Sequence, residues 1–169
     1  SFKFARTFFM KPISLIPTSL CRNLKYIFTD IDDTLTLQGK LLPESYAALW
    51  EAKAAGISIV PVSGRPAGWI DHIARMWPVI AAIGENGAFV FFMKDGKLHK
   101  RYMLPKKQRE KHQKKLAVIL EKIKKAVPAA KVSSDQGYRE FDLSIDYCED
   151  IPRLSAHSIA KIIQTFKSH

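Results

Sequence analysis

The chain has 169 residues, of which 47% are hydrophobic, enough to build a core and far from the composition of a disordered chain. Two cysteines, Cys21 and Cys148, exclude a disulfide framework and a cysteine-rich zinc site, and no apolar run approaches the roughly 18 residues that suggest a membrane span. The net charge of +11 raises the question of an anionic partner, but it is local, because 13 basic and three acidic side chains lie within residues 94–125.

Residues 1–24 contain no acidic side chain and are rich in Phe, Ser and Pro, a composition similar to that of a transit peptide. Met10 allows a second interpretation, in which the native protein starts there and residues 1–9 are upstream read-through. We expect residues 1–24 to form a tail outside the fold. Because the tail has no secretory core and the cysteine usage is typical of a reduced compartment, we predict a cytoplasmic protein, or an organelle protein if the tail is a transit peptide.

From Lys25 onward, short apolar runs alternate with segments of helical periodicity, a pattern that predicts βαβ units around a parallel sheet. Both predicted helices begin at a proline and carry an apolar stripe, so they should pack on the sheet. We also expect the tryptophans of these helices, Trp50, Trp69 and Trp77, to belong to the core. The predicted strands are 26–28, 57–62 and 79–83, and the predicted helices are 43–56 and 66–78.

The pattern of apolar and polar residues changes after the third predicted strand. Asp95-Gly96 lies between two apolar runs and predicts a hairpin over residues 88–104. A long helix is expected at 105–127 and a last helix at 152–166. Between them, residues 141–147 alternate apolar and polar side chains, which predicts a half-buried strand. Its buried side would hold Phe141, Leu143, Ile145 and Tyr147, and its polar side Asp142, Ser144 and Asp146.

The predicted fold class is therefore α/β, with a partial Rossmann-like parallel sheet core at residues 25–87 and an α+β unit at residues 88–169. The long helix carries many lysines, yet the stretch from Lys106 to Lys125 has no aromatic residue. A nucleic-acid groove usually combines cations with aromatic side chains, so we interpret the stretch as a solvated helix face and expect no nucleic-acid partner. Binding of nucleic acid is a second interpretation, which predicts an affinity that falls steeply with salt.

Two carboxylates follow the first predicted strand directly. Asp30 and Asp32 stand at i and i+2 at the carboxyl end of a parallel strand, where open α/β sheets bind their ligands. Carboxylates beside a buried strand are costly unless a cation or donors compensate them, and Mg²⁺ prefers oxygen ligands. An acidic turn that caps the next element is the alternative. The close run of Asp30, Asp32 and Thr34 favours a magnesium site.

A second polar group follows the next strand of the predicted sheet. Ser63 would lie beside the carboxylates, Gly64 lets the chain turn closely against a ligand, and a helix N-terminus, which favours anions, follows at Pro66. By itself this segment, which includes Arg65, is an ordinary strand-to-helix turn. As the exit of the strand next to the one that carries Asp30, it predicts a phosphate site.

Residues 25–169 resemble the haloacid dehalogenase superfamily, and in particular its capped, sugar-phosphatase-like subclass (type IIB). Residues 30–34 match the first motif of that family, Ser63 matches the second, and residues 84–88 are similar to the segment that leads into the cap. The resemblance implies a Mg²⁺-dependent phosphomonoester hydrolase that acts on a small phosphorylated metabolite such as a sugar phosphate. It also implies that residues 88–169 are the cap.

The resemblance gives roles to the matched residues. Asp30 would be the nucleophile and form an aspartyl-phosphate, and Asp32 would act as general acid and then as general base. The carboxylate of Asp30 and the backbone carbonyl of Asp32 would bind Mg²⁺. Thr34 would orient the loop, while the Ser63 hydroxyl and nearby backbone N–H groups would hold phosphate oxygens. The predicted phosphate site comprises Thr34, Ser63, Gly64 and Arg65.

In capped members the cap supplies substrate selectivity, and we predict Asn86, Arg139 and Asp142 as substrate contacts. Members of the family complete the site with a lysine and a further acidic motif after the cap, and the sequence ends at His169 without them. We therefore expect a fragment that alone turns over little or no substrate, because much of the electrostatic stabilisation would be missing. A non-catalytic phosphate-binding or regulatory remnant of the family is the alternative.

Overall fold

The computed structural model describes residues 12–169. Of the predicted tail, residues 1–11 lie outside this range. Between Pro12 and Leu24 the chain forms η1 (Ile13–Leu15) and α1 (Thr18–Cys21), and the side chains described there are exposed. Within the described range, no helix combines the length and the apolar character that crossing a bilayer requires.

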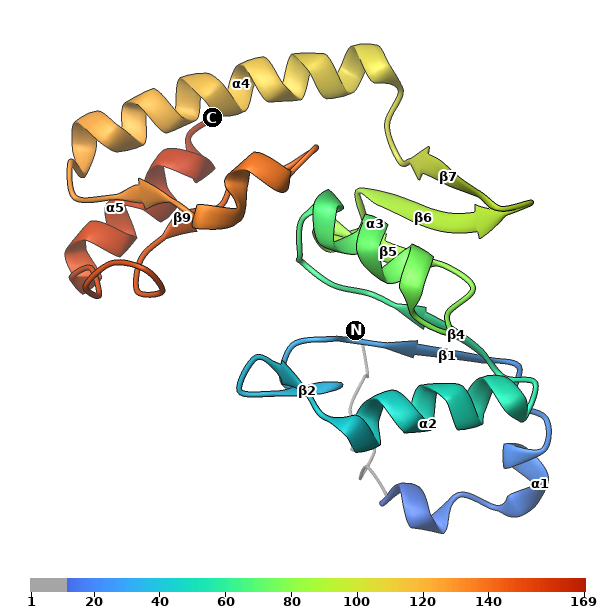
Figure 1. Ribbon diagram of the computed structural model, residues 1–169. Helices are drawn as coiled ribbons and strands as arrows, with labels where there is room; N and C mark the ends of the chain where they lie inside the picture. The colour runs from blue at the N-terminus through green and yellow to red at the C-terminus, as the bar shows by residue number, and fades with distance from the viewer. Residues whose placement is uncertain (1–11) are drawn as a thin grey trace, which may run out of the picture.

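Parallel strands form the centre of the first half of the protein (Figure 1). β1 (Tyr26–Thr29) pairs in parallel with β4 (Ser58–Pro61), and a parallel bridge between Val62 and Ile83 extends the arrangement to β5 (Ala82–Gly84). The α/β class and the first two predicted strands are therefore confirmed, whereas of the third, predicted over residues 79–83, only residues 82 and 83 are strand. The register of the first pair runs from Tyr26 opposite Ser58 to Thr29 opposite Pro61.

Two helices connect these strands as the sequence predicts. α2 (Pro43–Ala54) begins at its proline, which has no N–H to leave unpaired in the first turn, and contacts β4. α3 (Ala67–Met76) buries Ile70 and Ile73 against the strands. A short hairpin of β2 (Thr36–Leu37) and β3 (Lys40–Leu41), which the sequence analysis did not predict, precedes α2.

The expectation that the three tryptophans belong to the core is correct only for Trp77, which packs against the buried cluster. Trp50 is 49% exposed and Trp69 is 46% exposed. Each of these two rings lies instead under a cation, Lys53 over Trp50 and Arg65 over Trp69. A tryptophan with apolar neighbours in the sequence can therefore satisfy its ring at the surface through a cation–π contact.

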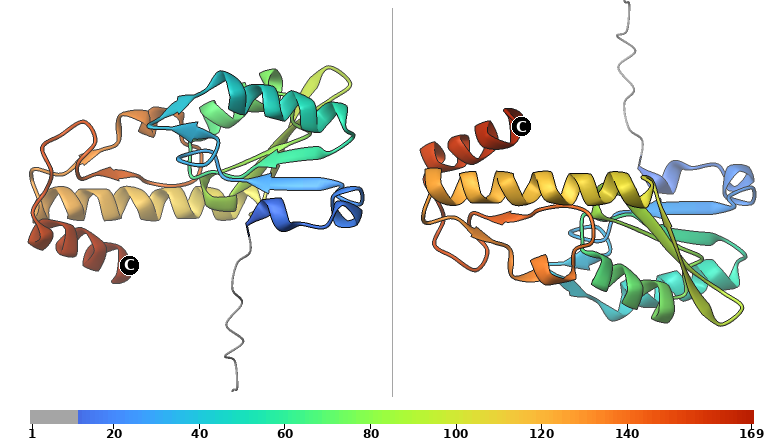
Figure 2. Two further views of the ribbon diagram at one scale, coloured as in Figure 1. Left: turned by 90° about the horizontal axis from the view of Figure 1, so that it is seen from below. Right: turned by 90° about the horizontal axis from the view of Figure 1, so that it is seen from above.

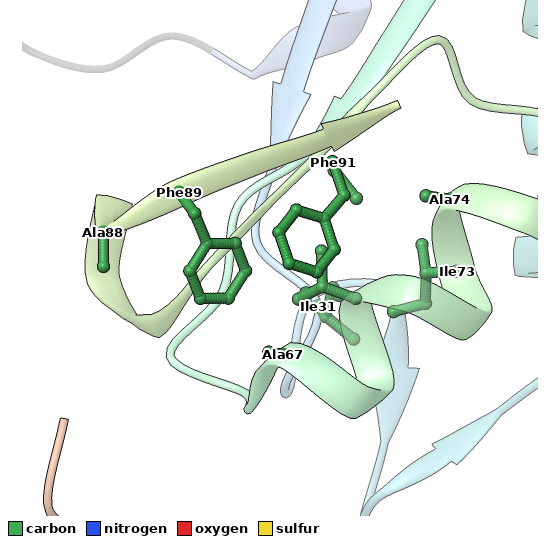
Figure 3. Packing of buried hydrophobic residues seen from close by; sticks show 9 residues of the cluster. Ile31, Ala67, Ile73, Ala74, Ala88, Phe89 and Phe91 are labelled. Carbon is green, nitrogen blue, oxygen red and sulfur yellow. The ribbon is translucent and has the colours of Figure 1, made fainter. Parts of the chain in front are cut away.

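The predicted hairpin is present and packs onto the first half. β6 (Phe89–Lys94) and β7 (Lys97–Tyr102) are joined by Asp95 and Gly96, whose φ angles of 50° and 72° fit the turn that Asp-Gly favours. β6 also pairs antiparallel with β5. The side chains of Phe89 and Phe91 pack with Ile31, Ala67, Ile73 and Ala74 in one buried cluster, shown in Figure 3. The division between residues 87 and 88 stays a prediction, and the hairpin beyond it shares its core with the residues before it.

The C-terminal part is built on two helices, α4 (Lys106–Ala126) and α5 (Ala156–Lys167), which pack together (Figure 2). Ser155 caps α5 by accepting the N–H of Ser158. A two-stranded sheet of β8 (Lys131–Val132) and β9 (Ile145–Asp146) joins them, with η3 (Ser134–Tyr138) between these strands. The second buried cluster is formed by Ile119, Ile123, Val127, Ala130 and Ile162.

The strand predicted over residues 141–147 is wrong except at β9, and the predicted sides are reversed at two positions. Asp146 is 4% exposed, whereas Tyr147 is exposed. The carboxylate of Asp146 accepts the backbone N–H groups of Cys148, Glu149 and Asp150, which lowers the pKa of this aspartate. At its C-terminal end the alternating pattern therefore leads into a turn that a buried carboxylate closes.

Candidate active site

One pocket brings together side chains from the carboxyl ends of the three parallel strands. Asp30 follows β1, Ser63 and Gly64 follow β4, and Asn86 follows β5, and all four line a pocket of about 350 Å³. The remainder of the lining is Phe28, Thr29 and Val62. The chain therefore places the predicted nucleophile, two predicted phosphate ligands and one predicted substrate contact around one space.

Ser63 is held at the base of the turn after β4. Its side chain is buried, and its Oγ accepts the backbone N–H of Arg65 at 3.0 Å. Its carbonyl accepts the N–H of Asn86 at 3.2 Å. A Cβ on Gly64 would lie 3.2 Å from Oδ1 of Asn86, which is tighter than ordinary contact. The turn after β4 and the turn after β5 are thus fitted against each other, and glycine is what permits the approach.

Arg65 forms an ion pair with Asp32 and does not line the pocket. Its Nη2 and Nε donate to the Asp32 carboxylate at 2.7 to 3.1 Å, and its guanidinium stacks over Trp69. The hydrogen bond to Asp32 is the main cause of a raised pKa at Arg65. The predicted acid/base residue is therefore held by the arginine that the sequence assigned to the phosphate.

The loop after Asp30 is fixed by Thr36, whose role the sequence analysis missed. Thr36 Oγ1 donates to the carbonyl of Ile31 at 3.0 Å and accepts the N–H of Asp33 at 3.2 Å. The side chain of Thr34, predicted to orient this loop, is exposed and is not part of the pocket lining. Asp33 has a φ of 54°, in the left-handed region, and its N–H donates to Thr36. A threonine at the start of a short strand gives no local signal for this contact.

Two predicted substrate contacts have structural partners instead. Arg139 has a side chain only 9% exposed and forms ion pairs with Asp135 at 3.1 Å and Asp142 at 2.9 Å. Burial lowers the pKa of Arg139, but the hydrogen bonds to both carboxylates outweigh it and raise the pKa. Arg139 Nη1 also donates to the carbonyl of Gly64 at 3.1 Å. Of the three predicted substrate contacts, only Asn86 lines the pocket.

Glu85 is the other residue that the sequence analysis missed. It is 3% exposed, and its carboxylate accepts four backbone N–H groups at 2.6 to 3.0 Å. One donor is Ala67, the first residue of α3, and the other three are residues 140–142 of the C-terminal part. Four donors compensate the cost of burying a charge. Glu85 therefore fastens the segment that carries Arg139 to the turn that carries Ser63.

Comparison with known proteins decides the family. The sequence matches the haloacid dehalogenase-like hydrolases over residues 27–167. This chain belongs to that family. Among solved structures, a protein of Thermoplasma acidophilum is similar with a TM-score of 0.65 and 14% identity, over 86% of this chain and 57% of that one.

A second likeness is to the IMP-nucleotidase of Plasmodium falciparum, with a TM-score of 0.55 and 13% identity. It covers 86% of this chain and 41% of that protein. The haloacid dehalogenase-like chain described here therefore spans 57% or less of the length of these two structures. A search of curated proteins finds no match. At such identities the likeness to solved structures shows the fold.

The pocket of this haloacid dehalogenase-like hydrolase offers oxygen donors of the kind that Mg²⁺ prefers. Asp30 presents an exposed carboxylate to the pocket, whereas Asp32 does not line it and its carboxylate pairs with Arg65. Within residues 12–169 no three acidic, histidine or cysteine side chains gather as a metal site. Mg²⁺ keeps several waters and is often held by one or two carboxylates together with substrate phosphate, so these donors fit it.

Proposed function

We propose that the protein is a phosphomonoester hydrolase of the haloacid dehalogenase family, with Asp30 as nucleophile. One observation carries the proposal: Asp30, Ser63, Gly64 and Asn86 come from three strand exits and line one pocket of about 350 Å³. Such a volume is at the lower end of the range for small-molecule sites, which supports a small phosphorylated metabolite, such as a sugar phosphate, as substrate.

The residues support a two-step reaction. An oxygen of Asp30 attacks the phosphorus and forms an aspartyl-phosphate as the bond from phosphorus to the leaving oxygen breaks. That oxygen takes a proton from Asp32 in its protonated form, whereas the ionised form pairs with Arg65. Asp32 then takes a proton from water, whose oxygen attacks the phosphorus and releases phosphate and Asp30. The ion pair with Arg65 fixes where the Asp32 carboxylate lies. The Ser63 hydroxyl and backbone N–H groups of the turn would hold the phosphate oxygens.

Mg²⁺ would be held by the carboxylate of Asp30 and the carbonyl of Asp32. It would reduce the repulsion between the carboxylate of Asp30 and the anionic phosphate. Asp30 lines the pocket, whereas the carboxylate of Asp32 pairs with Arg65, so the two aspartates have different surroundings. Residues 88–169 would form the cap of the family, and the cytoplasmic location stays a prediction.

A non-catalytic phosphate-binding protein is the second candidate, and one feature of the pocket favours it. The described lining contains no lysine or arginine. A phosphoryl group in this space would meet dipoles and a metal ion, but no protein cation. Electrostatic stabilisation usually contributes more to catalysis than any other effect, so binding without turnover is consistent with the same pocket.

Binding and turnover are therefore tested separately on the 169-residue chain. Inorganic phosphate is titrated with Mg²⁺ while backbone amide resonances are followed, and shifts are expected at Ser63, Gly64 and Asn86. Shifts confined to other amides, or none, would refute the phosphate site. Release of phosphate from a panel of sugar phosphates and nucleoside monophosphates is then measured by malachite green, with Asp30→Asn as the control. Turnover that Asp30→Asn abolishes supports the hydrolase, and binding without turnover supports the second candidate.

A further inference from the structure

We propose that Arg139 is a positioning residue of the phosphate site, which acts on Ser63 through the peptide group between Gly64 and Arg65. The inference rests on the proposed function, because it concerns the same pocket. Arg139 does not line that pocket. Its buried guanidinium donates at 3.1 Å to the carbonyl of Gly64, which does line the pocket.

The Gly64–Arg65 peptide is held at both ends. A peptide group is planar, so its C=O and N–H point in fixed opposite directions. The carbonyl of Gly64 accepts from Arg139, and the N–H of Arg65 donates to Oγ of Ser63 at 3.0 Å. Rotation of this peptide would break both hydrogen bonds together. Arg139 therefore keeps the N–H aimed at the serine oxygen.

This contact determines what the serine can do. A hydroxyl has one hydrogen to donate and two lone pairs to accept with. Because Oγ of Ser63 already accepts from Arg65, it is oriented with its hydrogen free for another acceptor, and Ser63 lines the pocket. A phosphate oxygen there would be such an acceptor. The buried arginine thus sets Ser63 as a donor without touching the phosphate.

Several contacts hold the segment around Arg139 in place. Asp135 and Asp142 hold the guanidinium from two sides, and Glu85 accepts the N–H groups of residues 140–142. An arginine can serve three acceptors at once because its five N–H groups lie in one planar fork. A lysine at this position would have a single nitrogen with no fixed plane, and could not reproduce the set.

The test is a double-mutant cycle on phosphate affinity, measured by amide titration of the 169-residue chain with Mg²⁺. Arg139→Met and Ser63→Ala should each lower the affinity for inorganic phosphate about tenfold, which is the effect of one hydrogen bond to a charged group. The affinity of the double variant should also fall only about tenfold, because both changes remove the same contact. Arg75→Met is the matched control, because Arg75 pairs with Asp71 on the surface of α3 and should leave phosphate affinity unchanged.

A second measurement needs no ligand. Hydrogen exchange at the Arg65 amide should be at least about tenfold faster in Arg139→Met than in wild type, whereas Arg75→Met should not change it. Additive losses in the cycle, or an unchanged Arg65 amide, would overturn the inference while leaving the phosphate site in place. A wild-type chain that binds no phosphate would instead remove the proposed function, and the inference with it. If Arg139→Met does not fold, Arg139→Lys carries the same two measurements.

Discussion

Replacing Glu85 by glutamine tests the contact that joins the two parts of the protein. The carboxylate accepts Ala67 and Glu140 through Oε1 and Phe141 and Asp142 through Oε2. Glutamine keeps one oxygen and sets an NH₂ group against the other two donors. Two charge-assisted hydrogen bonds are then lost, at about 1.5 to 3 kcal/mol each. We expect Glu85→Gln to lower the free energy of unfolding by roughly 3 to 6 kcal/mol, a large part of the total of about 5 to 15 kcal/mol usual for proteins.

Urea unfolding followed by circular dichroism and tryptophan fluorescence measures the change. Glu121→Gln is the matched control, because the same chemical change there affects an exposed pair with Lys124, worth at most about 1 kcal/mol. In folded Glu85→Gln, exchange at the amides of residues 141 and 142 should rise more than exchange within α2. If Glu85→Gln were no less stable than Glu121→Gln, the four hydrogen bonds would not fasten the two parts, and the reasoning would be wrong.

Three further changes test neighbouring contacts. Gly64→Ala should weaken phosphate binding several-fold in the amide titration, because its Cβ would lie 3.2 Å from Oδ1 of Asn86 and displace that side chain. Arg65→Gln should change phosphate affinity less than about twofold but lower any phosphate release about tenfold by freeing Asp32. If Arg65 bound the phosphate instead, the variant would change the affinity more than the release. Hydrogen bonds from a lysine and a tyrosine of β7 outweigh burial and lower the pKa of Glu140. The stabilising effect of Glu140 is therefore present above the ordinary glutamate pKa of about 4.3, and it is lost as the pH falls through the lower pKa of the folded state. Unfolding measured from pH 6 to pH 3 should show this loss, and Glu140→Gln should reduce the slope.

Local patterns were sufficient to predict the parts of the fold that depend on them. Apolar runs bounded by turn residues predicted β1, β4 and the β6–β7 hairpin, and prolines predicted where α2 and α3 begin. The meeting of Asp30 with Ser63 also followed from sequence order, because successive parallel strands place their carboxyl ends at one edge of a sheet. These predictions needed no knowledge of distant contacts.

Two of the missed features depend on partners far away in the sequence. Glu85 finds three of its four donors at residues 140–142, and Arg139 finds its acceptor at Gly64. Asp146 is an example of a local pattern with two meanings, since alternation predicts a strand and also fits a carboxylate that closes a turn. Periodicity gives the side of an element on which a residue lies, but it does not identify the donor that compensates a buried charge.

The same contacts predict that phosphate binding depends on Mg²⁺. Both arginines at the turn after β4 form ion pairs with carboxylates, Arg65 with Asp32 and Arg139 with Asp135 and Asp142. The charge of a phosphate in the pocket would therefore be met by hydrogen-bond donors and opposed by the carboxylate of Asp30.

We expect Mg²⁺ to raise phosphate affinity at least about tenfold over EDTA in the amide titration, since a bound cation removes the repulsion from that carboxylate. In Asp30→Asn this dependence should nearly vanish, because the repulsion and the metal ligand are removed by one change. Equal wild-type affinities in Mg²⁺ and in EDTA would mean that a protein cation reaches the phosphate, and Arg65 leaving Asp32 would then be the first contact to examine.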